Sequence, residues 1–183
     1  QYAEKSAHAN ALVTSALNLG KALLDNQQAE FLGGLLRQSK NNIERLPPNS
    51  DAAYHWLSLG QIYRDGVSRG AISAEGRLKA LAAYQAALRL AQAEKNKALQ
   101  SFANGYLGEL YEDEQRAEDG LKYTRQALFY AQEAADDSLL YRWQWQVARL
   151  LKLQNKPQQA LGAYRQAVAT LNRSRTQMTL GAG

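Results

Sequence analysis

Cysteine is absent from the sequence, which excludes disulfide scaffolds, thiolate zinc sites and a cysteine nucleophile. The two histidines leave little material for a histidine metal site. No apolar run reaches the roughly 18 residues that a membrane-spanning helix needs. Proline is scarce, with three in 183 residues. Because no nucleophile–base pair and no phosphate loop is recognisable, we expect no enzymatic activity, no metal and no cofactor within these residues.

The abundant residues are Ala, Leu, Gln, Glu, Lys and Arg, which are the strong helix formers. Valine occurs at only four positions, and alternating β-branched runs are absent. Apolar residues make up 45% of the chain, a fraction typical of folded proteins. The composition therefore predicts an all-α fold.

One eight-residue segment, from Trp56 to Tyr63, fits the pattern W-x-x-L-G-x-x-Y at all four fixed positions. A second pattern, Ala80-x-x-x-Tyr84-x-x-Ala87, follows it in the chain. Related but less complete patterns recur at residues 16–23, at 107–111 with 127–128, and at 160–167. One match would be weak evidence, whereas several copies indicate an internal repeat.

A 40-residue spacing recurs among the copies, and it separates Ala87 from Ala127 and Ala127 from Ala167. The first and second copies, at Gly20 and Gly60, are the same distance apart in the chain. The interval from Gly60 to the third copy is longer, so the second copy carries eight extra residues, around 66–70. Four copies in one register predict a stack of similar helix pairs, since one pair cannot bury its apolar face alone.

These patterns resemble the tetratricopeptide repeat, in a 40-residue form longer than the usual length of about 34 residues. The resemblance implies a right-handed α-solenoid of about four helix-turn-helix repeats, with about eight antiparallel helices. We expect a single array over residues 1–176, followed by a tail, 177–183, that leads to a further domain. The four repeats are expected at about 13–46, 53–94, 101–134 and 141–174.

Helix boundaries follow from the periodicity and from capping residues. We expect helices near 3–24, 28–45, 51–66, 74–95, 98–114, 117–135, 138–154 and 157–174. Asn49 and Asp136 are placed to cap the third and seventh helices, and Pro157 to begin the last. No composition shift separates two domains.

Family resemblance also implies a concave face, lined by the first helix of each repeat. Binding residues for a protein or peptide partner are expected at eleven of these positions: Lys21, Tyr54, Gln61, Arg64, Phe102, Glu109, Glu112, Arg142, Trp145, Arg149 and Lys152. The chaperone-binding carboxylate clamp of the family is not expected, because only Arg142 matches its charge pattern.

Charge is unevenly distributed along the second half of the chain. Residues 109–137 contain nine acidic and three basic side chains, whereas 141–183 contain seven basic and no acidic ones. Arg142, Arg149 and Lys152 share one helix face with Trp145, a patch that suits an acidic or C-terminal peptide. The alternative is a solvated face whose arginines pair with the acidic segment.

Five aromatic residues are expected in the repeat core: Trp56, Tyr63, Tyr84, Tyr111 and Tyr164. Trp143 and Trp145 are two residues apart on one helix and cannot both face the core, so one of them should be exposed. The last helix carries an apolar stripe at Leu161, Tyr164, Val168 and Leu171. Solenoids normally end in a polar cap, so we expect a following domain to cover this stripe.

The end of the chain, residues 163–168 through Arg175 and Gly181, resembles the junction in bacterial CHAT-domain proteins. There, a long-period array runs into a caspase-like peptidase domain. The resemblance implies that this chain is a fragment, the docking or sensing part of a larger protein, whose catalytic His and Cys lie downstream.

These observations predict a non-catalytic scaffold that binds a peptide or protein segment on its concave face. One alternative is an oligomerisation or intramolecular regulatory module for an adjacent CHAT-type peptidase domain, with self-association through the uncapped last helix. A more remote alternative is nucleic-acid binding by the basic fourth repeat, although a net charge of +5 is modest and no nucleic-acid motif is present. No membrane partner is expected.

Overall fold

The computed structural model describes residues 2–180, with side chains placed for residues 6–176. Within this part of the chain there are eight α-helices and no strand, and helix accounts for 84% of the residues. The predicted all-α fold is therefore confirmed. The helices form two compact units, residues 1–99 (the N-terminal unit) and 100–183 (the C-terminal unit). The single continuous array stays a prediction.

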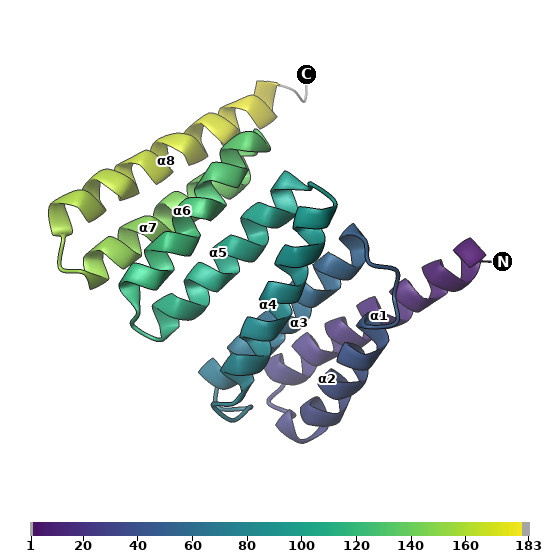
Figure 1. Ribbon diagram of the computed structural model, residues 1–183. Helices are drawn as coiled ribbons and strands as arrows, with labels where there is room; N and C mark the ends of the chain where they lie inside the picture. The colour runs from purple at the N-terminus through teal and green to yellow at the C-terminus, as the bar shows by residue number, and fades with distance from the viewer. Residues whose placement is uncertain (1, 181–183) are drawn as a thin grey trace. The chain divides into compact units, whose positions relative to one another are not determined.

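The N-terminal unit contains α1 (Tyr2–Asp25), α2 (Ala29–Ile43), α3 (Ser50–Ser68) and α4 (Gly76–Ala93). Each helix runs back alongside the one before it, and α3 packs against α1, α2 and α4 (Figure 1). Leu17, Leu32, Leu36, Ile62 and Tyr84 are almost completely buried. These side chains form the core of the unit, since each helix turns its apolar face towards its neighbours.

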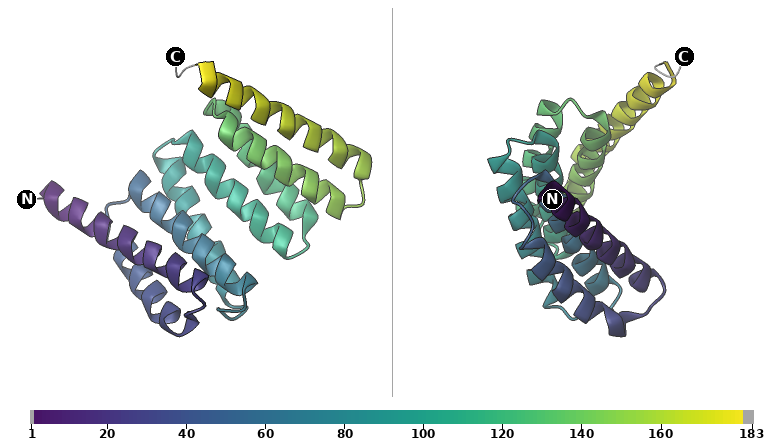
Figure 2. Two further views of the ribbon diagram at one scale, coloured as in Figure 1. Left: turned by 180° about the vertical axis from the view of Figure 1, so that it is seen from behind. Right: turned by 90° about the vertical axis from the view of Figure 1, so that its right-hand side faces the viewer.

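The C-terminal unit begins within the first turn of α5 (Lys97–Asp113) and continues with α6 (Ala117–Glu133), α7 (Asp137–Leu153) and α8 (Pro157–Leu180). Figure 2 shows α8 lying along α7, and α7 also packs on α6. Leu121, Leu150, Leu151 and Ala160 form a buried cluster where α6, α7 and α8 meet. The unit is thus a stack of antiparallel helices with a continuous apolar interior.

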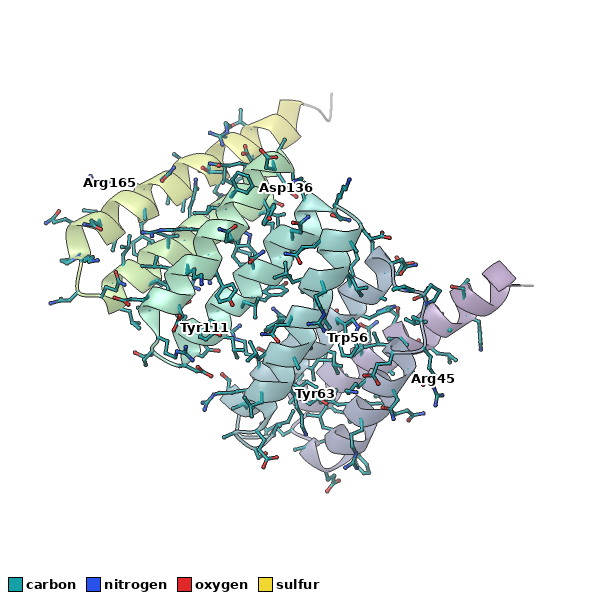
Figure 3. The ribbon with its side chains drawn as sticks, viewed as in Figure 1. Arg45, Trp56, Tyr63, Tyr111, Asp136 and Arg165 are labelled. Atoms are coloured by element: carbon teal, nitrogen blue, oxygen red, sulfur yellow. The ribbon has the colours of Figure 1, made fainter. Side chains whose placement is uncertain are left out.

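Most helix ends lie within two residues of their predicted positions, and the capping residues act as expected. The side chain of Asn49 accepts a hydrogen bond from the amide of Ala52 at 3.1 Å. Asp136, labelled in Figure 3, accepts from the amides of Ser138 and Leu139 at 2.9 and 3.2 Å. Pro157 begins α8, which continues to Leu180 and not to 174. The rest of the predicted tail, 181–183, lies outside the described residues.

Five turns between helices contain a residue with a left-handed backbone that is not glycine. These residues are Gln27 (φ 59°), Lys95 (54°), Gln115 (60°), Ala135 (51°) and Asn155 (58°). In each turn two amides bond back into the helix, as where Lys95 donates to Gln92 at 3.1 Å and Asn96 to Ala91 at 3.0 Å. This is the Schellman end, which satisfies the last carbonyls of a helix. The same turn therefore recurs at equal intervals from Lys95 to Asn155.

The eight extra residues of the second predicted repeat lengthen α3 and widen the turn after it. The helix extends to Ser68, and Gly70 adopts a φ of 70° in the loop that leads to α4. Ile72 packs back against Gly66, where a β-carbon would overlap its side chain. The insertion is thus folded onto the end of α3.

The predicted aromatic core is only partly enclosed. Tyr84 is completely buried and Tyr63 is 5% exposed, whereas Trp56, Tyr111 and Tyr164 are partly exposed. Tyr111, labelled in Figure 3, stacks on Tyr123, another partly exposed ring, at 5.4 Å between centroids. Within residues 2–180, no helix combines the length and apolar character that crossing a membrane requires.

Candidate functional site

Arg142, on α7, lies against an acidic and aromatic surface of α5. Its Nη2 is 3.2 Å from Oε1 of Glu109, a residue only 8% exposed. Its guanidinium carbon stands 4.9 Å from the ring centre of Tyr106 and 4.7 Å from that of Trp143. Burial opposes the charge of Arg142, but Tyr106 and Glu109 outweigh it and raise the pKa of the guanidinium. The cation is thus held by one carboxylate and two rings.

Arg149 follows two turns later on the same face of α7 and forms a bidentate pair. Its Nε and Nη2 donate to the two carboxylate oxygens of Glu112 at 2.7 and 2.8 Å. Hydrogen bonding to Glu112 raises the pKa of Arg149, against the effect of burial. Because two parallel hydrogen bonds join the guanidinium to the carboxylate, they fix the orientation of the guanidinium more strictly than a single contact would.

An open cleft of about 370 Å³ lies beside these two arginines. Its lining combines charged groups of α5 and α7 with apolar groups of α8: Glu109, Tyr141, Arg142, Trp145, Arg149, Ala167, Val168 and Leu171. Trp145 is 44% exposed, and its ring meets that of Tyr164 edge to face at 4.8 Å. The cleft therefore offers an exposed indole and aliphatic wall next to two oriented cations.

Trp143 anchors α7 to the rest of the C-terminal unit. Its ring is completely buried and occupies the space where Gly105 has no side chain. Its Nε1 donates to Ser101 Oγ at 2.9 Å, and that hydroxyl donates to the carbonyl of Ala127 at 2.8 Å. This chain links α7, α5 and α6, so the cleft is built on a rigid support.

Gln146 adds a second link of the same kind. Its Nε2 donates to the carbonyl of Gly105 at 3.1 Å and to Thr124 Oγ1 at 2.9 Å. Gln146 is 1% exposed, so both bonds are shielded from water. Trp143 and Gln146 thus hold α7 on its inner face, while Trp145 and the two arginines line the cleft.

The predicted binding residues divide between the two units. Six of them come together around α5 and α7: Phe102, Glu109, Glu112, Arg142, Trp145 and Arg149. Lys152 is exposed on α7 but does not line the cleft. The remaining four lie in the N-terminal unit, where Lys21 is on α1 and Tyr54, Gln61 and Arg64 are on α3.

The tryptophan prediction is confirmed, since Trp143 is buried and Trp145 is exposed. The pairing that the charge pattern suggested is also present, at Arg142–Glu109 and Arg149–Glu112. A partner on this face stays a prediction.

Sequence reasoning missed the wall that α8 contributes to the cleft. Ala167, Val168 and Leu171 line it together with Tyr141 of α7. The sequence shows the apolar stripe on the last helix, but it predicts contact with a following domain and gives no sign of a cleft. Family resemblance directed attention to first helices, whereas this cleft also uses a second helix.

Among the described residues, no group of three or more His, Asp or Glu side chains is placed to hold a metal ion. The chain matches no protein-family model, and no curated protein shows significant similarity to it. Function therefore has to be argued from the residues of this chain.

Proposed function

We propose that this chain is a tetratricopeptide-type helical array, a right-handed solenoid, that binds a peptide or protein segment and catalyses no reaction. The repeat is supported by the 40-residue spacing of the motifs and by the identical turns at equal intervals from Lys95 to Asn155. Binding is supported above all by the cleft beside Trp145, because an exposed indole next to oriented arginines is typical of a peptide-binding surface.

The chemistry of the cleft favours an acidic segment or a C-terminal carboxylate. Arg142 and Arg149 remain 38% exposed although each contacts a glutamate. Glu112 takes two of the five N–H groups that the guanidinium of Arg149 offers, so further acceptors can be bound. An apolar side chain of the ligand would pack on Trp145 and Val168 while its carboxylate approaches the arginines.

The test compares capture of immobilised peptides with acidic C-termini by the wild type and by three variants. Arg149→Glu and Trp145→Ala should each weaken capture about tenfold or more, since one reverses a charge and the other removes the indole. Arg165→Glu makes the same charge change on α8, away from the cleft, and should leave capture unchanged (Arg165 is labelled in Figure 3). Equal capture by the wild type, Arg149→Glu and Trp145→Ala would contradict the proposal.

A second candidate is an oligomerisation or regulatory module for an adjacent CHAT-type peptidase domain. The exposed apolar side chains of α8 favour it, because Leu161 is 45% and Val168 is 46% exposed. Nucleic-acid binding is less well supported. Seven basic residues would carry nucleic-acid binding. Three of them are already paired with carboxylates: Arg142, Arg149 and Arg173.

A further inference from the structure

A groove of about 420 Å³ runs between α2, α3 and α4 of the N-terminal unit. Its floor is formed by Trp56, Leu59 and Tyr63 of α3, of which Trp56 is partly exposed (Trp56 and Tyr63 are labelled in Figure 3). On α4, Ala82 and Ala86 lie one turn apart and face the groove. Because their side chains are small, the space above the floor stays open. The volume falls within the range of about 300–1,000 Å³ that is usual for ligand sites.

The two walls of this groove are basic. Arg37 and Lys40 stand on α2, and Lys79 and Arg89 stand on α4. Lys40 is paired with Glu44, the one acidic residue of the lining, at 2.6 Å. Among the side chains that the structure describes, Arg37, Lys79 and Arg89 form no ion pair. The groove therefore carries three uncompensated positive charges.

Lys79 of the α4 wall and Arg37 of the α2 wall act on the Tyr63 ring of the floor. Lys79 Nζ is 5.7 Å from the centre of the Tyr63 ring. Burial raises the pKa of the Tyr63 phenol, and the nearby positive charge of Arg37 opposes this shift. Positive groups of both walls thus lie close to the same ring.

We propose that this groove is a second binding site, for an extended acidic protein segment that places an apolar side chain against Trp56. The site is separate from the cleft on α5, α7 and α8 and does not depend on it. Charge complementarity identifies the occupant, because three unpaired cations attract a segment rich in carboxylates.

The spacing of the cations favours an extended chain over a compact anion. Lys79 and Arg89 are ten residues apart on α4, which corresponds to about 15 Å along the helix axis. An extended peptide covers that distance with roughly four or five residues. A single phosphate group would contact only one end of the groove, whereas glutamates at intervals can meet cations on both walls.

The test is isothermal titration calorimetry of the full chain with the peptide Glu-Glu-Leu-Glu-Glu-Phe-Glu. Arg89→Glu should weaken binding at the groove about tenfold or more. Arg77→Glu is the matched control, because it makes the same change on α4 at an exposed position outside the lining, and it should have no effect. A peptide with Gln in place of every Glu should bind at least about tenfold more weakly.

A second variant avoids any disturbance of the core. Ala82 is exposed, so Ala82→Glu places a negative charge in the groove without changing buried packing, and it should also weaken binding. Arg149→Glu should leave binding at the groove unchanged, so the two sites are distinguishable. The proposal is overturned if Arg89→Glu binds like Arg77→Glu, if the Gln peptide binds equally well, or if tripolyphosphate binds at the groove and the peptide does not.

Discussion

At the scale of single residues, two missing side chains decide how the helices pack. Gly60 of α3 faces the ring of Tyr84, and Gly105 of α5 faces the ring of Trp143. Both rings are completely buried. Because a β-carbon at either glycine would overlap the ring, each glycine lets a large aromatic residue fill the space between two helices.

Gly60→Ala should therefore destabilise the protein by about 1–3 kcal/mol, the usual cost of overpacking a core. Gly33→Ala is the matched control, since nothing lies within 4 Å of its added β-carbon on the exposed face of α2. This control should gain up to about 1 kcal/mol, because alanine replaces glycine inside a helix. Chemical denaturation measures both, and equal stability of the two variants would refute the packing argument.

Of these two glycine contacts, only that of Gly60 could be predicted from the sequence. Gly60 stands in a motif whose small residue admits a neighbouring helix, so its role could be predicted. Gly105 belongs to none of the sequence motifs, and its contact with Trp143 depends on which of two tryptophans turns inward. Trp143 turns inward, where it fills the space at Gly105 and donates to Ser101, and no local sequence pattern specifies these contacts.

At the scale of helices and turns, the same Schellman geometry ends α1, α4, α5, α6 and α7. None of these turns uses glycine, although the left-handed backbone costs other residues about 1–2 kcal/mol. Ala135 has no side-chain polar group that could offset this cost. The turn after α6 thus offers a direct test of the local conformation.

Ala135→Gly should stabilise the protein by about 0.5–1 kcal/mol, because glycine adopts a φ of 51° without steric conflict. Ala134→Gly is the adjacent control, since Ala134 has an ordinary helical φ of −83° and glycine gains nothing there. Thermal unfolding should place Ala135→Gly above the wild type and Ala134→Gly at or below it. The reverse order would show that the turn is not left-handed at 135.

Helix positions were predictable because capping residues and the 40-residue spacing are local signals. The end of α8 was placed too early, since Leu180 has no breaker before it. The α8 wall of the cleft was missed for another reason. A stripe of apolar residues predicts that a helix face contacts another apolar surface. Only the neighbouring side chains of α7 show that part of this stripe lines a cleft.

At the scale of the whole molecule, the two units differ in their charges, because neighbouring helices of the C-terminal unit exchange ion pairs whereas the groove of the N-terminal unit keeps three cations that are unpaired among the described side chains. Glu109 and Glu112 of α5 hold two arginines of α7, and Asp137 holds Arg173 of α8 at 2.8 Å. Residues 100–183 contain ten basic and nine acidic residues, so most of the net charge of +5 belongs to residues 1–99. Leu161 and Val168 of α8 are exposed.

This exposed pair predicts self-association at high concentration. Leu161 and Val168 are seven residues apart and lie on one face of α8, where they form an apolar patch. Light scattering should give a mass above that of the monomer for the wild type, and Leu161→Lys should restore the monomer.

The control for this prediction is Leu78→Lys, which makes the same change at a 69% exposed position of α4 and should leave the mass unchanged. A monomeric wild type at the highest attainable concentration would count against association through α8.

The distribution of the three tryptophans gives the two units separate optical signals. Trp56 belongs to residues 1–99, and Trp143 and Trp145 to residues 100–183. A Trp145→Phe variant would leave one indole in each unit, partly hydrated at Trp56 and dry at Trp143. Their emission maxima should differ, so a single denaturant titration can follow each unit. Coincident transitions would mean that the chain unfolds as one cooperative body, and separate transitions would give each unit its own free energy of unfolding.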